Sequence, residues 1–294
     1  MTAQQLHSTA AGSDGFVMVA VLWILGALST AVSIYAIFVI DTAKSFPVHD
    51  DRLQAEALVS AALELTAYRQ LNAVAQSRPT QGQFNFRLGQ ANVVVEFRSE
   101  AARIDLNTAP KHLLVGLFIA LGANSGDAEI YSDRVVGWRT TPPHGDNVSA
   151  HPRPSAGYRA REAKFPHPNE LLLVHGLPPA LVQRALQFVT VYSGRPQVNV
   201  RDAAPEVLAA FPGMSEKLVN AVLEQRRTAP ENGQALLELL GTAKQHATLE
   251  GSNALRVTAH VTFDNGRRTS SEVVILLFEQ GEEPFSIFSW RDEL

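Results

Sequence analysis

The stretch at residues 12–41, GSDGFVMVAVLWILGALSTAVSIYAIFVID, decides how the chain is organised. A short polar segment ends at Gly15, and no formally charged residue follows from Phe16 to Ile40. At about 1.5 Å per residue, a helix of that length measures roughly 37 Å, which exceeds a hydrocarbon core about 30 Å thick. The sequence therefore predicts a membrane-spanning helix at residues 16–40.

An uncleaved anchor explains this stretch better than a secretory signal or a soluble helix does. A secretory signal has a basic start and an apolar region of only about 7 to 15 residues, whereas this leader contains no lysine or arginine. A soluble helix of this length would carry a polar face. The first basic residues after the span are Lys44 and Arg52, so the positive-inside rule does not support a cytoplasmic N-terminus.

Composition limits the classes of function. The chain has 294 residues, enough for one large domain or two small ones, and a formal net charge of -4. A protein that mainly neutralises phosphates would need a basic stripe, so the charge argues against nucleic acid as a partner. The chain contains no cysteine, which excludes disulfides, thiol catalysis and cysteine-based zinc sites.

After the span, helical and strand patterns alternate. Pro47 is expected to kink or interrupt the helix, and residues 50–76 predict an amphipathic helix, with an expected apolar face of Leu53, Ala57, Ala61, Leu65 and Tyr68. Residues 84–88 and 91–98 predict one β-hairpin, and residues 254–263 and 271–279 predict a second around Asn265-Gly266. The tail at residues 284–290 predicts one more strand. A helical block at residues 105–250 separates the two hairpins, so we expect an α+β fold in which a helical domain is inserted into a sheet.

The helical block contains an internal repeat. Residues 104–122, IDLNTAPKHLLVGLFIALG, and residues 198–213, VNVRDAAPEVLAAFPG, share one pattern that leads into a helix. Pro110 and Pro205 are expected in first helical turns, with Thr108 and Asp202 as caps. Residues 169–186 repeat the helix, glycine, helix arrangement. The block is therefore predicted to hold tandem helical hairpins of the SAM-like or helix-hairpin-helix type.

The N-terminal stretch resembles the leader of type IV pilins and pseudopilins. The residues that carry this resemblance are Gly15-Phe16 followed by VMVAVLWIL. It implies that a prepilin peptidase cuts between Gly15 and Phe16 and that Phe16 becomes N-methylated. Most members of that family have a glutamate at the fifth mature position, where this chain has Ala20. That departure, with VLW at residues 21–23 and RIDLNTAP at residues 103–110, resembles the K-type minor pseudopilin of type II secretion systems.

The resemblance implies a type IV pilin-like α+β fold, with a long N-terminal helix on an antiparallel sheet and a large inserted all-helical domain. The implied boundaries are 1–15 for the leader, 16–40 for the transmembrane helix, 41–104 for the amphipathic helix and first hairpin, 105–250 for the insertion and 251–294 for the last strands. Because Ala20 offers no carboxylate to the free amine of a neighbouring subunit, a place at the end of a filament is expected.

The resemblance also implies a function. A K-type subunit has no enzymatic activity; it belongs to the pseudopilus tip complex, which initiates assembly and assists protein export across the outer membrane. The implied partners are the I-type and J-type minor pseudopilins, with the H type as a further candidate, the inner-membrane assembly platform, the prepilin peptidase and the lipid bilayer. The implied location is the bacterial inner membrane, crossed once, with the C-terminal domain in the periplasm.

K-type pseudopilins commonly carry an aspartate-rich calcium motif, and this sequence departs from it. Trp138-Arg139 aligns with the motif, but Gly137, Thr140 and Pro142 stand where its aspartates would be. Calcium needs several oxygen ligands in one loop. We therefore expect the calcium loop to be lost or weakened, and we assign no cofactor.

Three alternatives stay open at this stage. Residues 198–227 also resemble DNA-binding helix-hairpin-helix repeats, which would suit a membrane-anchored protein of the competence type. However, the turn has a single glycine, Gly213, and Glu216 would oppose phosphate. A histidine metal site from His144, His151, His167 and His175 is the second alternative. The third is an anchored periplasmic enzyme, for which the sequence contains none of the nucleophile-elbow, phosphate-loop or HExxH motifs.

Overall fold

The computed structural model describes residues 14–74, 78–140 and 162–293. For residues 14–16, 40–51 and 293 it describes the backbone alone. The chain divides into two units, Met1–Ala57 and Leu58–Leu294. Helix α1 (Asp14–Asn72) begins in the first unit and ends in the second.

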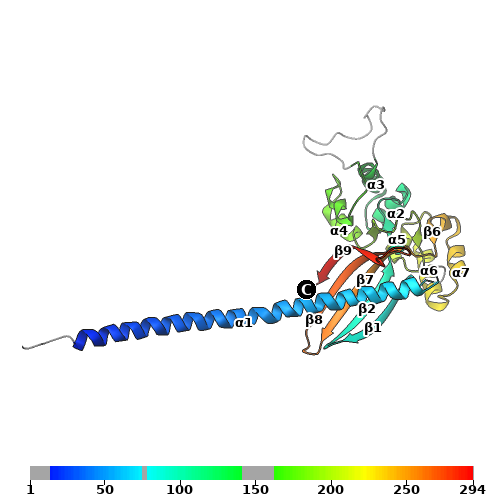
Figure 1. Cartoon of the computed structure of the whole chain (residues 1–294). Coiled ribbons are helices and arrows are strands. Elements are labelled where there is room, and N and C mark those ends of the chain that lie inside the picture. The colour runs from blue at the N-terminus through cyan, green and yellow to red at the C-terminus, as the bar shows by residue number, and fades with distance from the viewer. Residues whose placement is uncertain (1–13, 75–77, 141–161, 294) are drawn as a thin grey trace, which may run out of the picture. The chain divides into compact units, whose positions relative to one another are not determined.

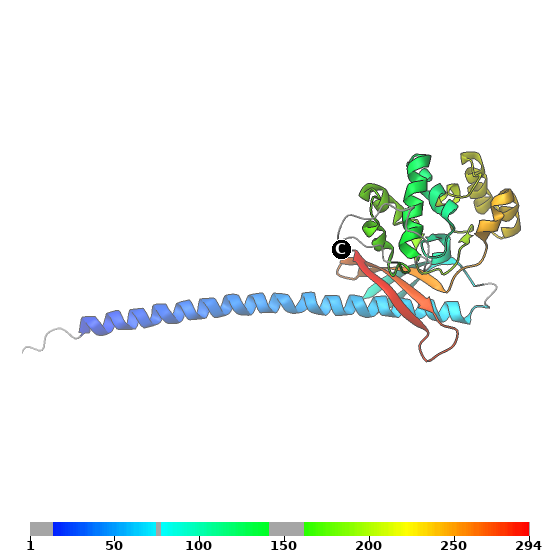
Figure 2. The same ribbon diagram turned by 90° about the horizontal axis from the view of Figure 1, so that it is seen from above.

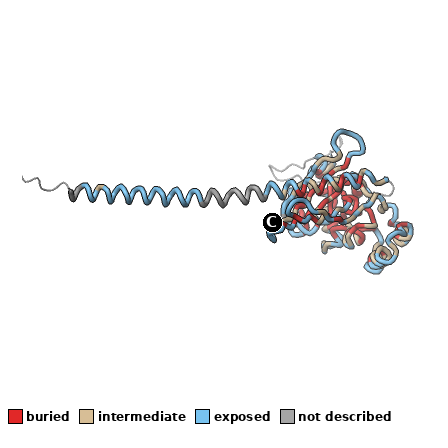
Figure 3. The backbone as a smooth tube through the Cα atoms, turned by 60° about the horizontal axis from the view of Figure 1, so that its bottom comes forward, coloured by how far each residue is buried: buried red, intermediate tan, exposed pale blue. Residues whose placement is uncertain are grey.

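The first unit consists of the N-terminal part of α1. Its apolar segment, Val17–Val39, has a mean hydropathy of 2.3, and none of it is buried (Figure 3). It is long and apolar enough to cross a membrane, as the sequence predicts. Pro47 does not interrupt the helix, because α1 continues to Asn72. Of the two expected effects, a kink or an interruption, the interruption is therefore wrong: one proline removes a single backbone hydrogen bond from a helix that keeps its other bonds on both sides.

The C-terminal part of α1 packs on one face of the sheet in the second unit (Figure 1). The side chains buried there are Leu58, Val59, Ala62, Leu63, Thr66, Ala67 and Gln70. They recur at helical spacing, but they form a different stripe from the predicted one. Leu53 and Tyr68 are instead 55% and 68% exposed. The face of α1 that packs on the sheet is thus set by the tertiary contact, and Tyr68 lies outside it.

The sheet has five antiparallel strands in the order β1-β2-β7-β8-β9. The strands are β1 (Gln81–Leu88), β2 (Ala91–Ser99), β7 (Ala254–Phe263), β8 (Arg268–Leu277) and β9 (Phe285–Glu293). Both predicted hairpins and the predicted last strand are present. The two hairpins, which are far apart in the sequence, join into one sheet because β2 pairs with β7, with Val95 opposite Ala259. Gly266 turns the second hairpin at a φ of 85°, which few residues other than glycine adopt.

The segment between β2 and β7, called the insertion below, holds most of the helices (Figure 2). Its helical elements are η2 (Glu100–Ala102), α2 (Lys111–Ala120), α3 (Ser125–Arg139), η3 (Pro168–Leu173), α4 (Pro179–Ala185), α5 (Pro205–Ala209), α6 (Glu216–Thr228), α7 (Gly233–Leu239) and η4 (Gly241–His246). Leu113, Leu117 and Leu208 are among the side chains that form its hydrophobic core.

The insertion is not all-helical, because the internal repeat begins with short strands. Strands β3 (Ile104–Asp105) and β4 (Val189–Thr190) pair in parallel, as do β5 (Val198–Asn199) and β6 (Ala247–Thr248). A two-residue strand is too short for a period-2 pattern to show in the sequence. The parallel pairing brings the end of each repeat back to its beginning.

The two repeats use the same turn. Asp105 Oδ1 accepts a hydrogen bond from the backbone N of Asn107 at 2.8 Å, and Asn199 Oδ1 accepts one from the backbone N of Arg201 at 2.8 Å. These side chains replace backbone hydrogen bonds at the point where the strand turns toward the helix. The repeat predicted from the sequence is therefore present in three dimensions.

The predicted helix caps are wrong. Thr108 Oγ1 donates to the backbone O of Arg195 at 2.7 Å, and Asp202 accepts from the side chain of Asn199 at 3.3 Å. Neither α2 nor α5 has a side-chain cap hydrogen bond. The polar side chains of the repeat thus join separate parts of the insertion. Pro205 lies in the first turn of α5, as predicted, and Pro110 immediately precedes α2.

Candidate functional site

The residues predicted for processing lie at the start of α1. Gly15 and Phe16 belong to its first turn, and their side chains are outside the described residues. Ala20 lies one turn further on and is half-exposed. The large side chains beyond it are exposed: Trp23 is 78% exposed and Tyr35 is 69% exposed. Apolar surface on this scale needs lipid or other apolar helices around it, so this segment is built for a membrane or for helix assembly.

The region aligned with the family calcium motif is part of a helix and of the core. Gly137 and Trp138 lie in the last turn of α3, and Thr140 follows it as the C-cap. Trp138 is 6% exposed and stacks on Phe165 with ring centroids 6.1 Å apart. Its ring is thus used for packing. Among the residues whose side chains the structure describes, no three histidines, aspartates or glutamates are grouped as a metal site would need.

The histidine metal site proposed from the sequence lies partly outside the described part of the chain. His144 and His151 fall within residues 141–161, which are outside it. His167 caps η3 by accepting a hydrogen bond from the backbone N of Asn169 at 3.1 Å. Asp133, one helical turn before Gly137, pairs with Lys111 at 2.8 Å. These contacts give His167 and Asp133 structural roles.

The helix-hairpin turn resembles a phosphate-binding turn only in its glycine. Gly213 has a φ of 76°, and Ser215 caps α6 by accepting from the backbone N of Leu218 at 3.3 Å. Of the two arginines at the end of α6, Arg227 pairs with Glu224 at 2.6 Å, and Arg226 donates to the backbone O of Ala203 at 2.7 Å. Burial lowers the pKa of Arg226 to about 10. Because both guanidinium groups contact protein acceptors, the turn does not present a basic surface.

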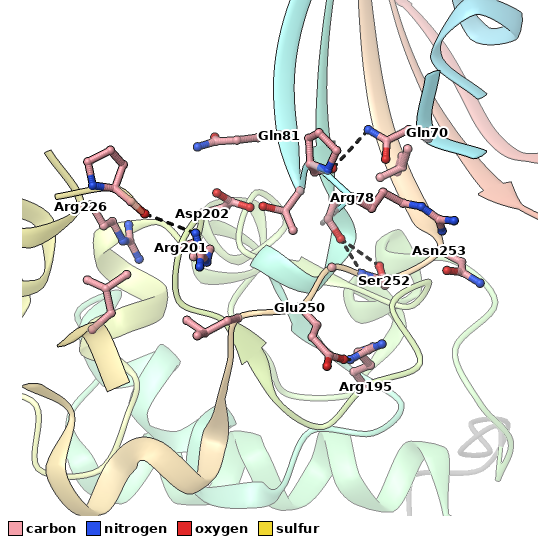
Figure 4. Close-up of a pocket in the computed structure, with 18 of the residues that line it drawn as sticks. Gln70, Arg78, Gln81, Arg195, Arg201, Asp202, Arg226, Glu250, Ser252 and Asn253 are labelled. Atoms are coloured by element: carbon pink, nitrogen blue, oxygen red, sulfur yellow. Dashed lines mark hydrogen bonds and ion pairs between the residues drawn. The ribbon is translucent and has the colours of Figure 1, made fainter. Parts of the chain in front are cut away.

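A polar cleft of about 970 Å³ lies where the insertion meets the sheet and the end of α1 (Figure 4). Ion pairs lie along its walls: Arg78 with Glu279 at 3.2 Å, and Arg195 with Glu250 at 3.0 Å. Arg201 donates to the backbone O of Pro230 at 3.3 Å. A cleft lined in this way can hold polar chain segments or water.

Asp202 is the buried acid of this cleft. Its side chain is 7% exposed, and burial raises the pKa of its carboxyl above the usual range. A hydroxyl from Thr80 and the positive charges of Arg98 and Arg226 act against this shift. Among the described lining residues, no nucleophile with an adjacent base accompanies Asp202. Among the described lining residues, Asp202 is therefore a buried acid whose partners are the hydroxyl of Thr80 and nearby arginines.

An ion network that sequence patterns do not indicate joins the insertion to the sheet. Glu100 in η2 is 1% exposed and accepts from Arg256 Nε of β7 at 2.8 Å, and also from Thr190 Oγ1 of β4. Arg256 pairs in addition with Glu272 of β8. Glu100 and Arg256 are 156 positions apart, so no local spacing connects them. This network links η2 and β4 of the insertion to β7 and β8 of the sheet.

Comparison with known proteins agrees with the fold. Residues 85–194 match the family model of the type II secretion system protein K. The chain resembles a chain in the crystal structure of the GspK–GspI–GspJ complex from the type 2 secretion system of enterotoxigenic Escherichia coli, with a TM-score of 0.55 and 18% identity. That likeness covers 86% of this chain and 99% of the other. No curated protein matches the chain. The predicted pilin-like α+β fold is confirmed.

Proposed function

We propose that this chain, a member of the protein K family of type II secretion systems, works as a minor pseudopilin in the complex at the pseudopilus tip. In that complex it would initiate assembly and assist protein export across the outer membrane. The observation that carries the proposal is the match of residues 85–194 to the family, joined to an N-terminal apolar helix that fits a single-pass anchor. The anchor would cross the inner membrane once and leave the second unit in the periplasm.

The proposed partners are the I-type and J-type minor pseudopilins. A related fold is found in a complex of GspK with GspI and GspJ. The exposed apolar side chains of Val17–Val39 provide a surface on which neighbouring helices could pack. The H-type pseudopilin, the assembly platform, the prepilin peptidase and the bilayer complete the proposed set.

The position at the tip is inferred from Ala20. A subunit inside a filament would need an acidic side chain near its N-terminus to pair with the free amine of the next subunit, because a lone charge in an apolar bundle is costly. Ala20 provides no such group. A subunit that occupies the end has one axial neighbour fewer, so the missing carboxylate costs it less there.

The proposed role is structural, without enzymatic activity. The described residues that line the polar cleft include no nucleophile in contact with a base, and Trp138 belongs to the core. Calcium binding at the family motif is not proposed, because Gly137 and Thr140 offer no carboxylate. Co-purification tests the role: the full chain in detergent should retain I-type and J-type subunits of the same secretion system. A chain that retains neither subunit would contradict the proposal.

A further inference from the structure

Arg103 begins the RIDLNTAP segment, and it is the residue of that segment whose side chain the fold does not explain. Asp105 and Asn107 form the turn of the first repeat, and Asn107 also donates to the backbone O of Phe165 at 2.9 Å. By contrast, the guanidinium of Arg103, a partly buried residue, forms no hydrogen bond or ion pair with any residue that the structure describes. A partly buried cation is stabilised by an acceptor that replaces the water it has lost.

Arg103 lines a small pocket between the insertion and the sheet. The pocket has a volume of about 280 Å³. The insertion contributes Arg103, His167 and Tyr192, and the sheet contributes Arg256, Glu272, Ser289 and Arg291. A cavity of this size is near the lower limit for small-molecule sites, which are about 300–1,000 Å³. It can admit one side chain.

The pocket carries an excess of positive charge. Three arginines, Arg103, Arg256 and Arg291, face two glutamates, Glu272 and the buried Glu100. Arg256 contacts both glutamates, and Arg291 lies 3.8 Å from Glu272. Burial, and then the charge of Arg256, lower the pKa of Arg103 to about 10. Both carboxylates are already engaged, so Arg103 remains available to an anion from outside.

The pocket adjoins one edge of the sheet. Strand β9 is one of the two edge strands, and it contributes Ser289 and Arg291 to the pocket. Ile287 and Phe288 of the same strand are each 47% exposed, and Phe288 stacks on Tyr192 with ring centroids 5.6 Å apart. Exposed aromatic and apolar side chains around an arginine are typical of the centre of a protein–protein contact.

We propose that this pocket receives the carboxylate of an aspartate or glutamate side chain from a neighbouring pseudopilin subunit, which docks against β9. A planar guanidinium binds a carboxylate through two parallel hydrogen bonds, and this geometry suits Arg103. The inference rests on the proposed function, because it takes the neighbouring subunit as the source of the carboxylate.

The test measures how tightly the full chain in detergent binds purified I-type and J-type subunits of the same secretion system. Arg103→Gln should weaken the affinity for one of them at least tenfold. Arg87→Gln is the matched control, because Arg87 is an exposed arginine paired with Asp264 at another part of the sheet. It should leave the affinity unchanged. Added glutarate, at constant ionic strength, should compete with the subunit for the wild-type chain and have no effect on Arg103→Gln.

Thermal melting separates this role from a structural one. Because Arg103 has no acceptor among the described residues, Arg103→Gln should melt at the wild-type temperature or above it. A lower melting temperature would indicate that Arg103 supports the fold, and would overturn the inference. Equal binding of both subunits by wild type and Arg103→Gln would overturn it too. Failure of the wild-type chain to bind either subunit would instead contradict the proposed function, and with it the proposed source of the carboxylate.

Discussion

Replacing Arg256 by methionine tests whether the buried ion network holds the insertion against the sheet. Arg256 on β7 is 15% exposed at its side chain and contacts Glu100 at 2.8 Å. Glu100 is 1% exposed, and among the described residues its other side-chain partner is the hydroxyl of Thr190. Methionine keeps much of the apolar stem and removes the charge. The variant therefore leaves a carboxylate buried without its counter-charge.

The expected cost follows from that uncompensated charge. Removing one partner of a buried ion pair destabilises a protein by about 3–5 kcal/mol. For a domain of about 150–250 residues, 1 kcal/mol shifts the melting temperature by about 2–4 °C, so Arg256→Met should lower it by about 6–20 °C. In the variant that also carries Glu100→Gln, the fully buried carboxylate is removed together with its cationic partner. The double variant should therefore recover part of the loss.

Thermal melting of the full chain in detergent, followed by tryptophan fluorescence, measures these differences. Arg87→Met is the control, because Arg87 and Asp264 form a pair with side chains 60% and 49% exposed. An exposed pair contributes about 0–1 kcal/mol, so this variant should melt within a few degrees of wild type. If Arg256→Met cost no more than the control, or if the double variant were no more stable than Arg256→Met alone, the network would not hold the two parts together.

Three further outcomes follow from the structure. Gly116→Ala would place a Cβ 2.0 Å from the backbone O of Ala210, so it should lower the free energy of unfolding, measured by urea denaturation, by more than about 2 kcal/mol. Gly137→Ala is the control: its Cβ would meet nothing within 4 Å, so it should not lower that free energy. Because the pKa of Asp202 is raised in the folded protein, its ionised carboxylate destabilises the fold at a pH above that pKa. The destabilisation disappears as the pH falls below it and the carboxyl becomes protonated. Asp202→Asn should therefore gain more in melting temperature, relative to wild type, at pH 7 than at pH 4; an equal difference at both values would show that burial of the charge is not the cause. In a mobility-shift assay, duplex DNA should show no salt-dependent binding, and binding that weakens steeply with salt would support the competence-type alternative.

Local patterns predicted the elements of this fold well where they are long or carry a turn signal. The span at residues 16–40 and the strands around Asn265-Gly266 follow from periodicity and turn chemistry within a short window. The repeat was also visible, because Asp105 and Asn199 each begin the same turn. These features depend on neighbours in sequence.

Features that depend on distant neighbours were missed or misplaced. The stripe of α1 that packs on the sheet contains Thr66, a polar residue that donates to the backbone O of Ala62 at 2.7 Å and so can be buried. A pattern based on apolar residues selected Tyr68 instead. The pairing of Glu100 with Arg256, and the packing of Trp138 on Phe165, join segments that only the fold brings together. Long-range contacts of this kind leave no period in the sequence.

The mature N-terminus tests the central claim most directly. If the chain is a minor pseudopilin, a prepilin peptidase cuts after Gly15 and the new N-terminus is methylated. Mass spectrometry of the chain, purified from a cell that carries the secretion system, should then find a first peptide that begins with N-methyl-Phe16. A chain that keeps residues 1–15 intact in those cells would contradict the account.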